Sequence, residues 1–141
     1  MYKRQPYSRR SCPGAAFATL LDVPGCRFVS LQIGPQSKQL TQLFDAAPLI
    51  RDMDDTAAIV DQLGVVVTVD TSIAHLAGAL GKPVLLLLPF SANWQWMHGE
   101  STAWYPTVRS FRQQRPGCWD EPLREVAAAL ADYARRCRNG I

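Results

Sequence analysis

Asp70, Thr71 and Ser72 follow a run of valines, VVVTVD at 65–70, and precede a segment rich in Ile, Leu, Ala and Gly. The valine run predicts a strand buried on both faces, and the segment after it predicts a helix. The first turn of a helix carries unpaired N–H groups and the positive end of the helix dipole, which together bind anions such as phosphate. The two hydroxyls and the imidazole of His75 add further donors. These residues predict an anion site at the start of the helix.

His75 lies on an unusual face of the predicted helix 72–80. At 100° per residue, one apolar stripe holds Ile73, Leu76, Ala77 and Leu80, and the opposite face holds His75 among Ala74, Gly78 and Ala79. Small residues let a ligand or another chain segment approach closely, which indicates a cleft wall. The alternative is that Asp70 or Thr71 only caps the helix and His75 is a structural histidine.

The wider pattern alternates apolar runs with amphipathic segments. Strands are expected at 27–33, 49–53, 65–69, 83–89 and 108–112, and helices at 13–23, 37–44, 56–64, 72–80 and 121–138. Strands separated by single helices imply right-handed crossovers and a parallel sheet. We therefore expect an α/β fold, a Rossmann-like doubly wound parallel sheet of about five strands with helices on both faces. Ligands of such sheets bind beyond the carboxyl ends of the strands. Gln32 lies at such an end, and it either contacts the ligand or only forms part of a turn.

Composition and charge limit the classes of partner that the chain could bind. The net charge of +3 comes largely from residues 1–12, a basic N-terminal segment in which Lys3, Arg4, Arg9 and Arg10 lie. The remaining chain, 13–141, is nearly neutral and predicts a single domain without a nucleic-acid partner. An export signal is the competing reading of the N-terminus, but Asp22 interrupts its apolar run. No run approaches the roughly 20 apolar residues of a membrane span.

The four cysteines, Cys12, Cys26, Cys118 and Cys137, show no metal-binding spacing, and the chain has only two histidines. We expect no metal site and a reducing, cytoplasmic setting.

The segment 55–97, DTAAIVDQLGVVVTVDTSIAHLAGALGKPVLLLLPFSANWQWM, resembles the nucleotide-sugar-binding half of GT-B glycosyltransferases of the heptosyltransferase group. It looks closest to the branch often fused to tetratricopeptide repeats. Shorter matches are RSCP (10–13), RFVSLQIGP (27–35), WYP (104–106) and RPGCWD (115–120), so the resemblance extends from about residue 8 to the C-terminus.

The resemblance implies roles for particular residues. The donor diphosphate would contact Thr71, Ser72 and their backbone amides, with His75 against the phosphates and Asp70 near the transferred sugar. Less directly, the base or ribose would lie near Asp52, Met53, Asp55 and Thr56. Such enzymes use the helix dipole and cationic donors, without a metal or other cofactor, to stabilise the leaving diphosphate.

Two departures limit the implied activity. The acceptor domain of these enzymes, which usually holds the catalytic base, has no counterpart in this chain, so no catalytic residue is assigned. The family's first strand, which is central in the sheet, is replaced by MYKRQPYS at 1–8. Either strands 27–33 and 65–69 pair directly, or another chain fills the gap.

Two functions follow. The first is the donor-binding domain of a glycosyltransferase, acting with a separate acceptor-binding domain or a second copy of the chain. The second is a non-catalytic interaction module or remnant of a larger glycosyltransferase. Four aromatic residues after the strand 83–89 either stack on sugar or pack their loop onto the sheet: Trp94, Trp96, Trp104 and Tyr105.

Overall fold

The computed structural model describes residues 11–34 and 42–140. Its strands are β1 (Val29–Ser30), β2 (Phe44–Asp45), β3 (Val66–Val69), β4 (Val84–Leu88) and β5 (Val108–Arg112). Its α-helices are α2 (Gly14–Phe17), α3 (Met53–Gln62), α4 (Ser72–Ala79) and α5 (Asp120–Arg138). The described residues also form the 3₁₀ helices η1 (Ala18–Leu20), η3 (Ala47–Leu49) and η4 (Trp94–Trp96).

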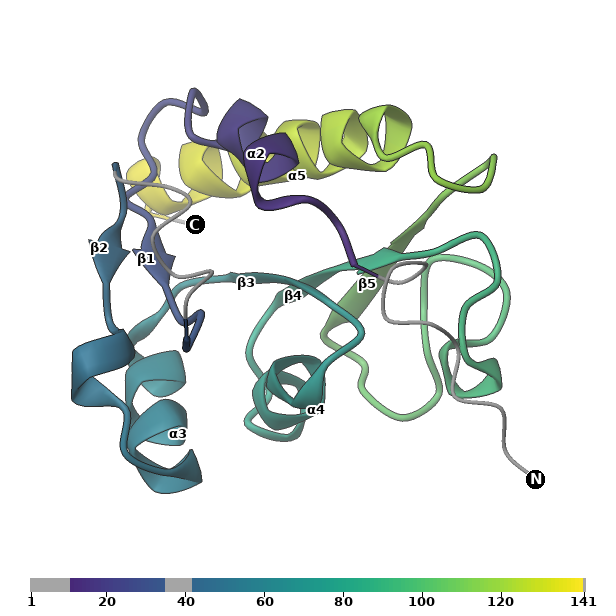
Figure 1. Cartoon of the computed structure of the whole chain (residues 1–141). Coiled ribbons are helices and arrows are strands. Elements are labelled where there is room, and N and C mark those ends of the chain that lie inside the picture. The colour runs from purple at the N-terminus through teal and green to yellow at the C-terminus, as the bar shows by residue number, and fades with distance from the viewer. Residues whose placement is uncertain (1–10, 35–41, 141) are drawn as a thin grey trace.

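The strands form two parallel sheets with helices on both sides. β1 pairs with β2, and a three-stranded sheet has the order β3-β4-β5. In Figure 1, α2 and α5 lie above the larger sheet, and α3 and α4 lie below it. The expected α/β class, with parallel strands and helices on both faces, is confirmed.

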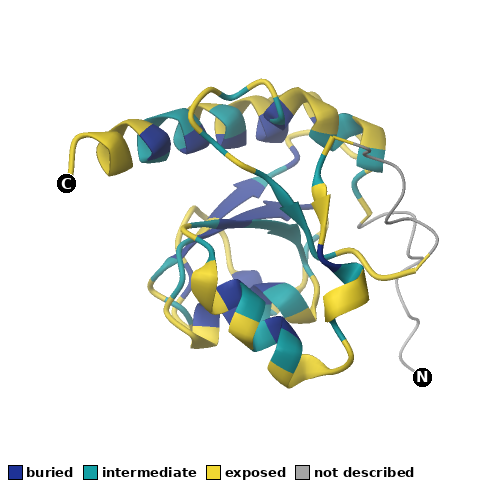
Figure 2. Ribbon diagram, turned by 90° about the vertical axis from the view of Figure 1, so that its left-hand side faces the viewer, coloured by how far each residue is buried: buried dark blue, intermediate teal, exposed yellow. Residues whose placement is uncertain are grey.

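β4 is the centre of the core because all five of its residues are buried. Successive side chains of a strand point to opposite faces. Leu86 accordingly packs on the side of α4, in a cluster with Ala74 and Ala77, while Leu87 packs on the side of α5, in a cluster with Val126. Burying each leucine contributes about 1.5–3 kcal/mol. Figure 2 shows the buried residues along the larger sheet and on the helix sides that face it.

The prediction of a strand at 49–53 is wrong. Pro48 lies in η3, where its fixed φ suits a helical turn, and the side chain of Asp52 starts α3 by accepting a hydrogen bond from the Asp55 N–H. The short strand β2 instead lies where the expected helix 37–44 ends, and residues 37–41 of that helix are outside the described residues. The expected helix 13–23 is divided into α2 and η1.

β1 and β3 do not pair with one another among the described residues. Side chains next to or in these strands nevertheless reach the same two cores: Phe28 packs on the α5 side with Val67, and Leu31 packs on the α4 side with Val66. The order β2-β1, then β3-β4-β5, is that of a doubly wound sheet whose central place no described strand fills. Direct pairing of the two strands is therefore wrong for the described residues. Residues 1–8, which precede α2 in the sequence, lie outside the described part.

Candidate functional site

The N-terminus of α4 is exposed and lacks a side-chain cap. Thr71, the N-cap residue, has φ −139° and ψ 174°, and no side-chain cap hydrogen bond forms. Its hydroxyl lies 3.2 Å from the Thr68 hydroxyl instead. The Ala74 N–H donates to the Thr71 carbonyl at 3.1 Å, but within the described residues no hydrogen bond satisfies the N–H groups of Ser72 and Ile73. Two backbone donors and two exposed hydroxyls are therefore available to an anion.

The N-terminus of α3 is different because its own acids fill it. Asp52 accepts from the Asp55 N–H at 2.9 Å, and the buried Thr56 hydroxyl donates to the Asp52 carbonyl at 2.9 Å. Arg51 donates to both Asp55 oxygens, at 2.9 and 3.2 Å, and to one of them also from its backbone N–H. These bonds hold the pKa of Asp55 below its usual range. A phosphate at this end would meet like charge, whereas α4 has no acid in its first turn.

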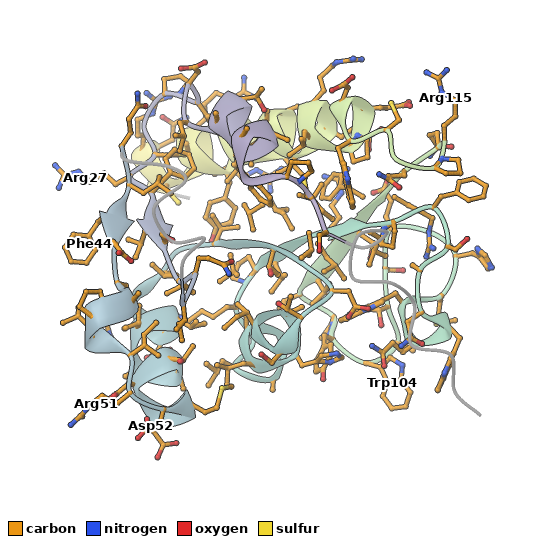
Figure 3. All side chains as sticks on the ribbon, viewed as in Figure 1. Arg27, Phe44, Arg51, Asp52, Trp104 and Arg115 are labelled. Atoms are coloured by element: carbon orange, nitrogen blue, oxygen red, sulfur yellow. The ribbon has the colours of Figure 1, made fainter. Side chains whose placement is uncertain are left out.

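The structure does not link the predicted site residues at the start of α3 to those at the start of α4. Figure 3 shows Arg51 and Asp52 at the end of α3, on the opposite side of the view from Trp104. No hydrogen bond or ion pair between described residues links Asp52, Asp55 or Thr56 to the α4 end. Their place near a base or ribose stays a prediction, as does that of the half-exposed Met53.

Asp70 and Gln32 follow the ends of β3 and β1, respectively. Asp70 is partly buried in the turn between β3 and α4, and its carboxylate has no hydrogen bond or ion pair with the described residues. Gln32 is exposed, and its backbone N–H donates to the Ser30 hydroxyl at 3.3 Å. A turn role for Gln32 is therefore visible, and a ligand role stays a prediction.

His75 joins α4 to an aromatic loop, defined here as residues 93–105. Its Nδ1 lies 3.1 Å from the Tyr105 hydroxyl, and its Nε2 lies 3.3 Å from the Gln95 amide nitrogen. Because that amide nitrogen donates, Nε2 of a neutral His75 accepts and Nδ1–H donates to Tyr105. The ring also lies against Trp96, with centroids 4.9 Å apart. His75 is thus held in a polar and aromatic network on the flank of the helix.

The small-residue face of α4 does admit a close approach, and the approaching group is Tyr105. A Cβ at Gly78 would lie 2.6 Å from the Tyr105 ring, so only glycine fits there. The helical-wheel prediction is wrong for Leu80, which is 42% exposed, and for Ala74, which is fully buried on the face assigned to a cleft. The buried small residues of the helix are Ala74, Ala77 and Gly78, while Ala79 stays exposed.

A pocket of about 240 Å³ opens between His75 and the aromatic loop. Its lining residues are His75, Trp94, Gln95, Trp96, Trp104 and Tyr105. Trp96 is fully buried, whereas Trp94 and Trp104 are 78% and 61% exposed. Trp96 and Tyr105 therefore pack, as one of the two alternatives predicted, whereas Trp94 and Trp104 remain at the surface, where stacking on a sugar stays a prediction. Sequence reasoning missed Gln95, since a glutamine beside two tryptophans gives no local signal of a histidine partner.

The described residues contain no group of three His, Cys, Asp or Glu side chains placed to hold a metal ion. All four cysteines are free, and burial raises the pKa of the Cys12 thiol to about 12, so Cys12 is not a thiolate at neutral pH. None of the described helices has the length and apolar character needed to cross a membrane.

Fold and site together define an α/β protein with a parallel sheet and an open helix N-terminus after one of its strands. No family model matches the chain, and no solved structure matches it. Protein FlbA of Caulobacter vibrioides is 30% identical in an alignment 137 residues long, which covers 90% of this chain and 23% of FlbA. The chain therefore spans about a quarter of the length of this relative.

Proposed function

We propose that this chain is the nucleotide-sugar-binding domain of a glycosyltransferase of the heptosyltransferase type. It binds the donor diphosphate at the N-terminus of α4, through the backbone of Ser72 and Ile73 and the hydroxyls of Thr71 and Ser72. The observation that carries the proposal is that this helix end is exposed and uncapped, while acids fill the end of α3. Asp70, at the end of β3, then lies beside the diphosphate and faces the sugar.

His75 is proposed to contact the phosphates after a local exchange of partners. In the unliganded network its Nε2 accepts from Gln95 at 3.3 Å, the longer of its two polar contacts. A phosphate oxygen that replaces Gln95 requires a proton on Nε2, which the imidazolium supplies. An adjacent dianion favours that charged form. The dipole of α4 and these donors stabilise the negative charge that develops on the leaving diphosphate, so the proposed transfer uses no metal.

Transfer itself is proposed to need an acceptor-binding domain, from a separate protein or a second copy of the chain. A charge at an exposed helix N-terminus gains only about 0.3–1 kcal/mol from the dipole. We therefore expect weak donor binding by this chain alone. The proposed setting is cytoplasmic, and the four free cysteines support it.

Titration of the ¹⁵N-labelled chain with nucleoside diphosphates and their sugars tests the proposal. Amide shifts are expected at Ser72 and Ile73, with none at the α3 residues Asp54 and Asp55. Ser72→Asp places a carboxylate at the α4 end and should abolish the shifts. Thr19→Asp makes the same charge change at an exposed residue of η1 and should leave them intact. Unchanged spectra at millimolar ligand, or shifts centred on α3, would sink the proposal.

The second candidate is a non-catalytic interaction module or remnant of a larger glycosyltransferase. The observation that favours it is the unpaired position between β1 and β3 among the described residues. It predicts a folded chain that binds no nucleotide and that associates with another polypeptide in sedimentation measurements. A monomer that binds and transfers a nucleotide sugar would refute it.

A further inference from the structure

We infer that the pocket between α4 and the aromatic loop binds one pyranose ring, which stacks on Trp94 or Trp104. The inference deepens the proposed function and rests on it for the origin of the sugar. It begins with size. A pocket of about 240 Å³ is smaller than the roughly 300–1,000 Å³ of sites that hold drug-sized ligands, so it suits a single ring and not a whole nucleoside.

The pocket presents apolar faces to solvent. Trp94 and Trp104 come from the two ends of the aromatic loop, and both stay largely exposed while Trp96 between them is buried. Two exposed indoles beside one pocket leave the largest aromatic side chains in contact with solvent. Aromatic rings bind the C–H faces of sugars and other flat rings. The occupant therefore has an apolar face.

The polar groups of the pocket fit hydroxyls. The Tyr105 hydroxyl and the Gln95 amide each offer both a donor and an acceptor, and His75 holds these two groups in place through its two ring nitrogens. Trp96 adds an indole Nε1–H that is buried with no hydrogen-bond partner among the described residues. Buried polar groups of native proteins are normally paired, so this donor points to an absent acceptor. A sugar hydroxyl both donates and accepts, and so matches the Tyr105 hydroxyl, the Gln95 amide and the Trp96 Nε1–H.

Charge favours a neutral occupant over an ionic one. The lining residues include no Lys, Arg, Asp or Glu, and the two ring nitrogens of His75 engage Tyr105 and Gln95. A phosphate in the pocket would lack a permanent cation, whereas a neutral ring needs none. The phosphate position at the α4 end is close by, because His75 is three residues beyond Ser72, or about 4.5 Å along the helix axis. A ring joined to a diphosphate at Ser72 reaches the pocket.

The test compares nucleoside diphosphates with their hexose conjugates on the full chain and on Trp94→Ala and Trp104→Ala. The variant that removes the stacking indole should weaken binding of the conjugate about three- to tenfold, and both variants should leave binding of the diphosphate unchanged. Phe90→Ala is the matched control, because Phe90 is an aromatic residue that is 50% exposed and does not line the pocket. It should change neither affinity. Equal binding of the conjugate by the parent chain and both tryptophan variants would overturn the inference while leaving the diphosphate site intact.

A second measurement does not depend on nucleotide binding. Methyl glycosides of glucose, galactose, mannose and N-acetylglucosamine are added to the ¹⁵N-labelled chain, and the four indole N–H signals are followed. The signal of Trp96 should shift, while that of Trp119, which packs against α5 in the other core, should not. Shifts with glycosides but no nucleotide binding would retain the pocket and reject the proposed function. No shift with any glycoside, or shifts with free nucleosides alone, would overturn the sugar assignment.

Discussion

At the residue scale, Gly78 shows how closely α4 and the aromatic loop fit. Alanine is favoured over glycine inside a helix by about 1 kcal/mol, so Gly78→Ala would stabilise an isolated helix. In this fold its Cβ would lie 2.6 Å from the Tyr105 ring. We expect the cost of this overpacking to exceed the gain in helix propensity. The free energy of unfolding, measured in urea, should therefore fall by about 1–3 kcal/mol.

Gly64→Ala is the control for this substitution. Its Cβ would lie 3.8 Å from the Tyr133 ring, an ordinary contact distance, so its stability should change little. In a Tyr105→Ala background the clash is absent, and Gly78→Ala should become neutral or stabilising. A Gly78→Ala protein as stable as the parent would contradict the close approach of Tyr105.

The residues around the start of α4 show how much of the candidate site could be predicted from the sequence. Asp70, Thr71, Ser72 and His75 are neighbours in the chain, so helix geometry alone placed them together. The partners of His75 lie 30 residues away at Tyr105 and 20 residues away at Gln95. No helical or strand periodicity links positions so far apart, because their contact depends on how the loop folds back over α4.

At the element scale, the strongest patterns gave the most accurate boundaries. The β-branched run at 65–69 and the apolar run at 83–89 became β3 and β4, and the expected strand 108–112 is β5. The failure at 49–53 arose because the short segment LIRDM has no strand periodicity of its own and also suits a 3₁₀ turn followed by a helix start. Pro48 and the capping side chain of Asp52 decided between these outcomes.

The burial of β4 predicts how its leucines contribute to stability. Leu86 is fully buried among α4 and the sheet, and Leu86→Ala should cost about 2–5 kcal/mol because it removes apolar contacts and leaves a cavity. Leu80→Ala deletes the same atoms at a position that is 42% exposed, and it should cost far less. Urea unfolding of both variants makes the comparison. Similar losses for the two would show that β4 is not the centre of the core.

At the scale of the whole molecule, the break between the two sheets is the main departure from a doubly wound fold. β4 is buried along its full length, but three of the four β3 residues are only partly buried. A run of β-branched residues is typical of a parallel strand that is covered on both faces. β3 therefore has the sequence of a strand inside a doubly covered sheet and, within the described residues, the pairing of an edge strand.

Amide hydrogen exchange tests whether that edge is open. The Val66 N–H donates to the Pro83 carbonyl at 2.9 Å, toward β4. Since successive N–H groups of a strand point in opposite directions, those of Val67 and Val69 point toward β1. We expect Val66 and Thr68 to exchange slowly and Val67 and Val69 to exchange much faster.

Leu85 and Leu86 of β4 are the internal reference, because β3 and β5 pair with both sides of that strand and both amides should be slow. Equal protection of Val67 and Val66 would contradict an open edge, since a further strand would then have to accept hydrogen bonds from β3. That strand would occupy the central position of the sheet, next to the turn that carries Asp70 and Thr71. Pairing of that strand with β3 would fix the turn at the start of α4. The rate of amide hydrogen exchange at Val67 and the affinity of the chain for a diphosphate should therefore change together.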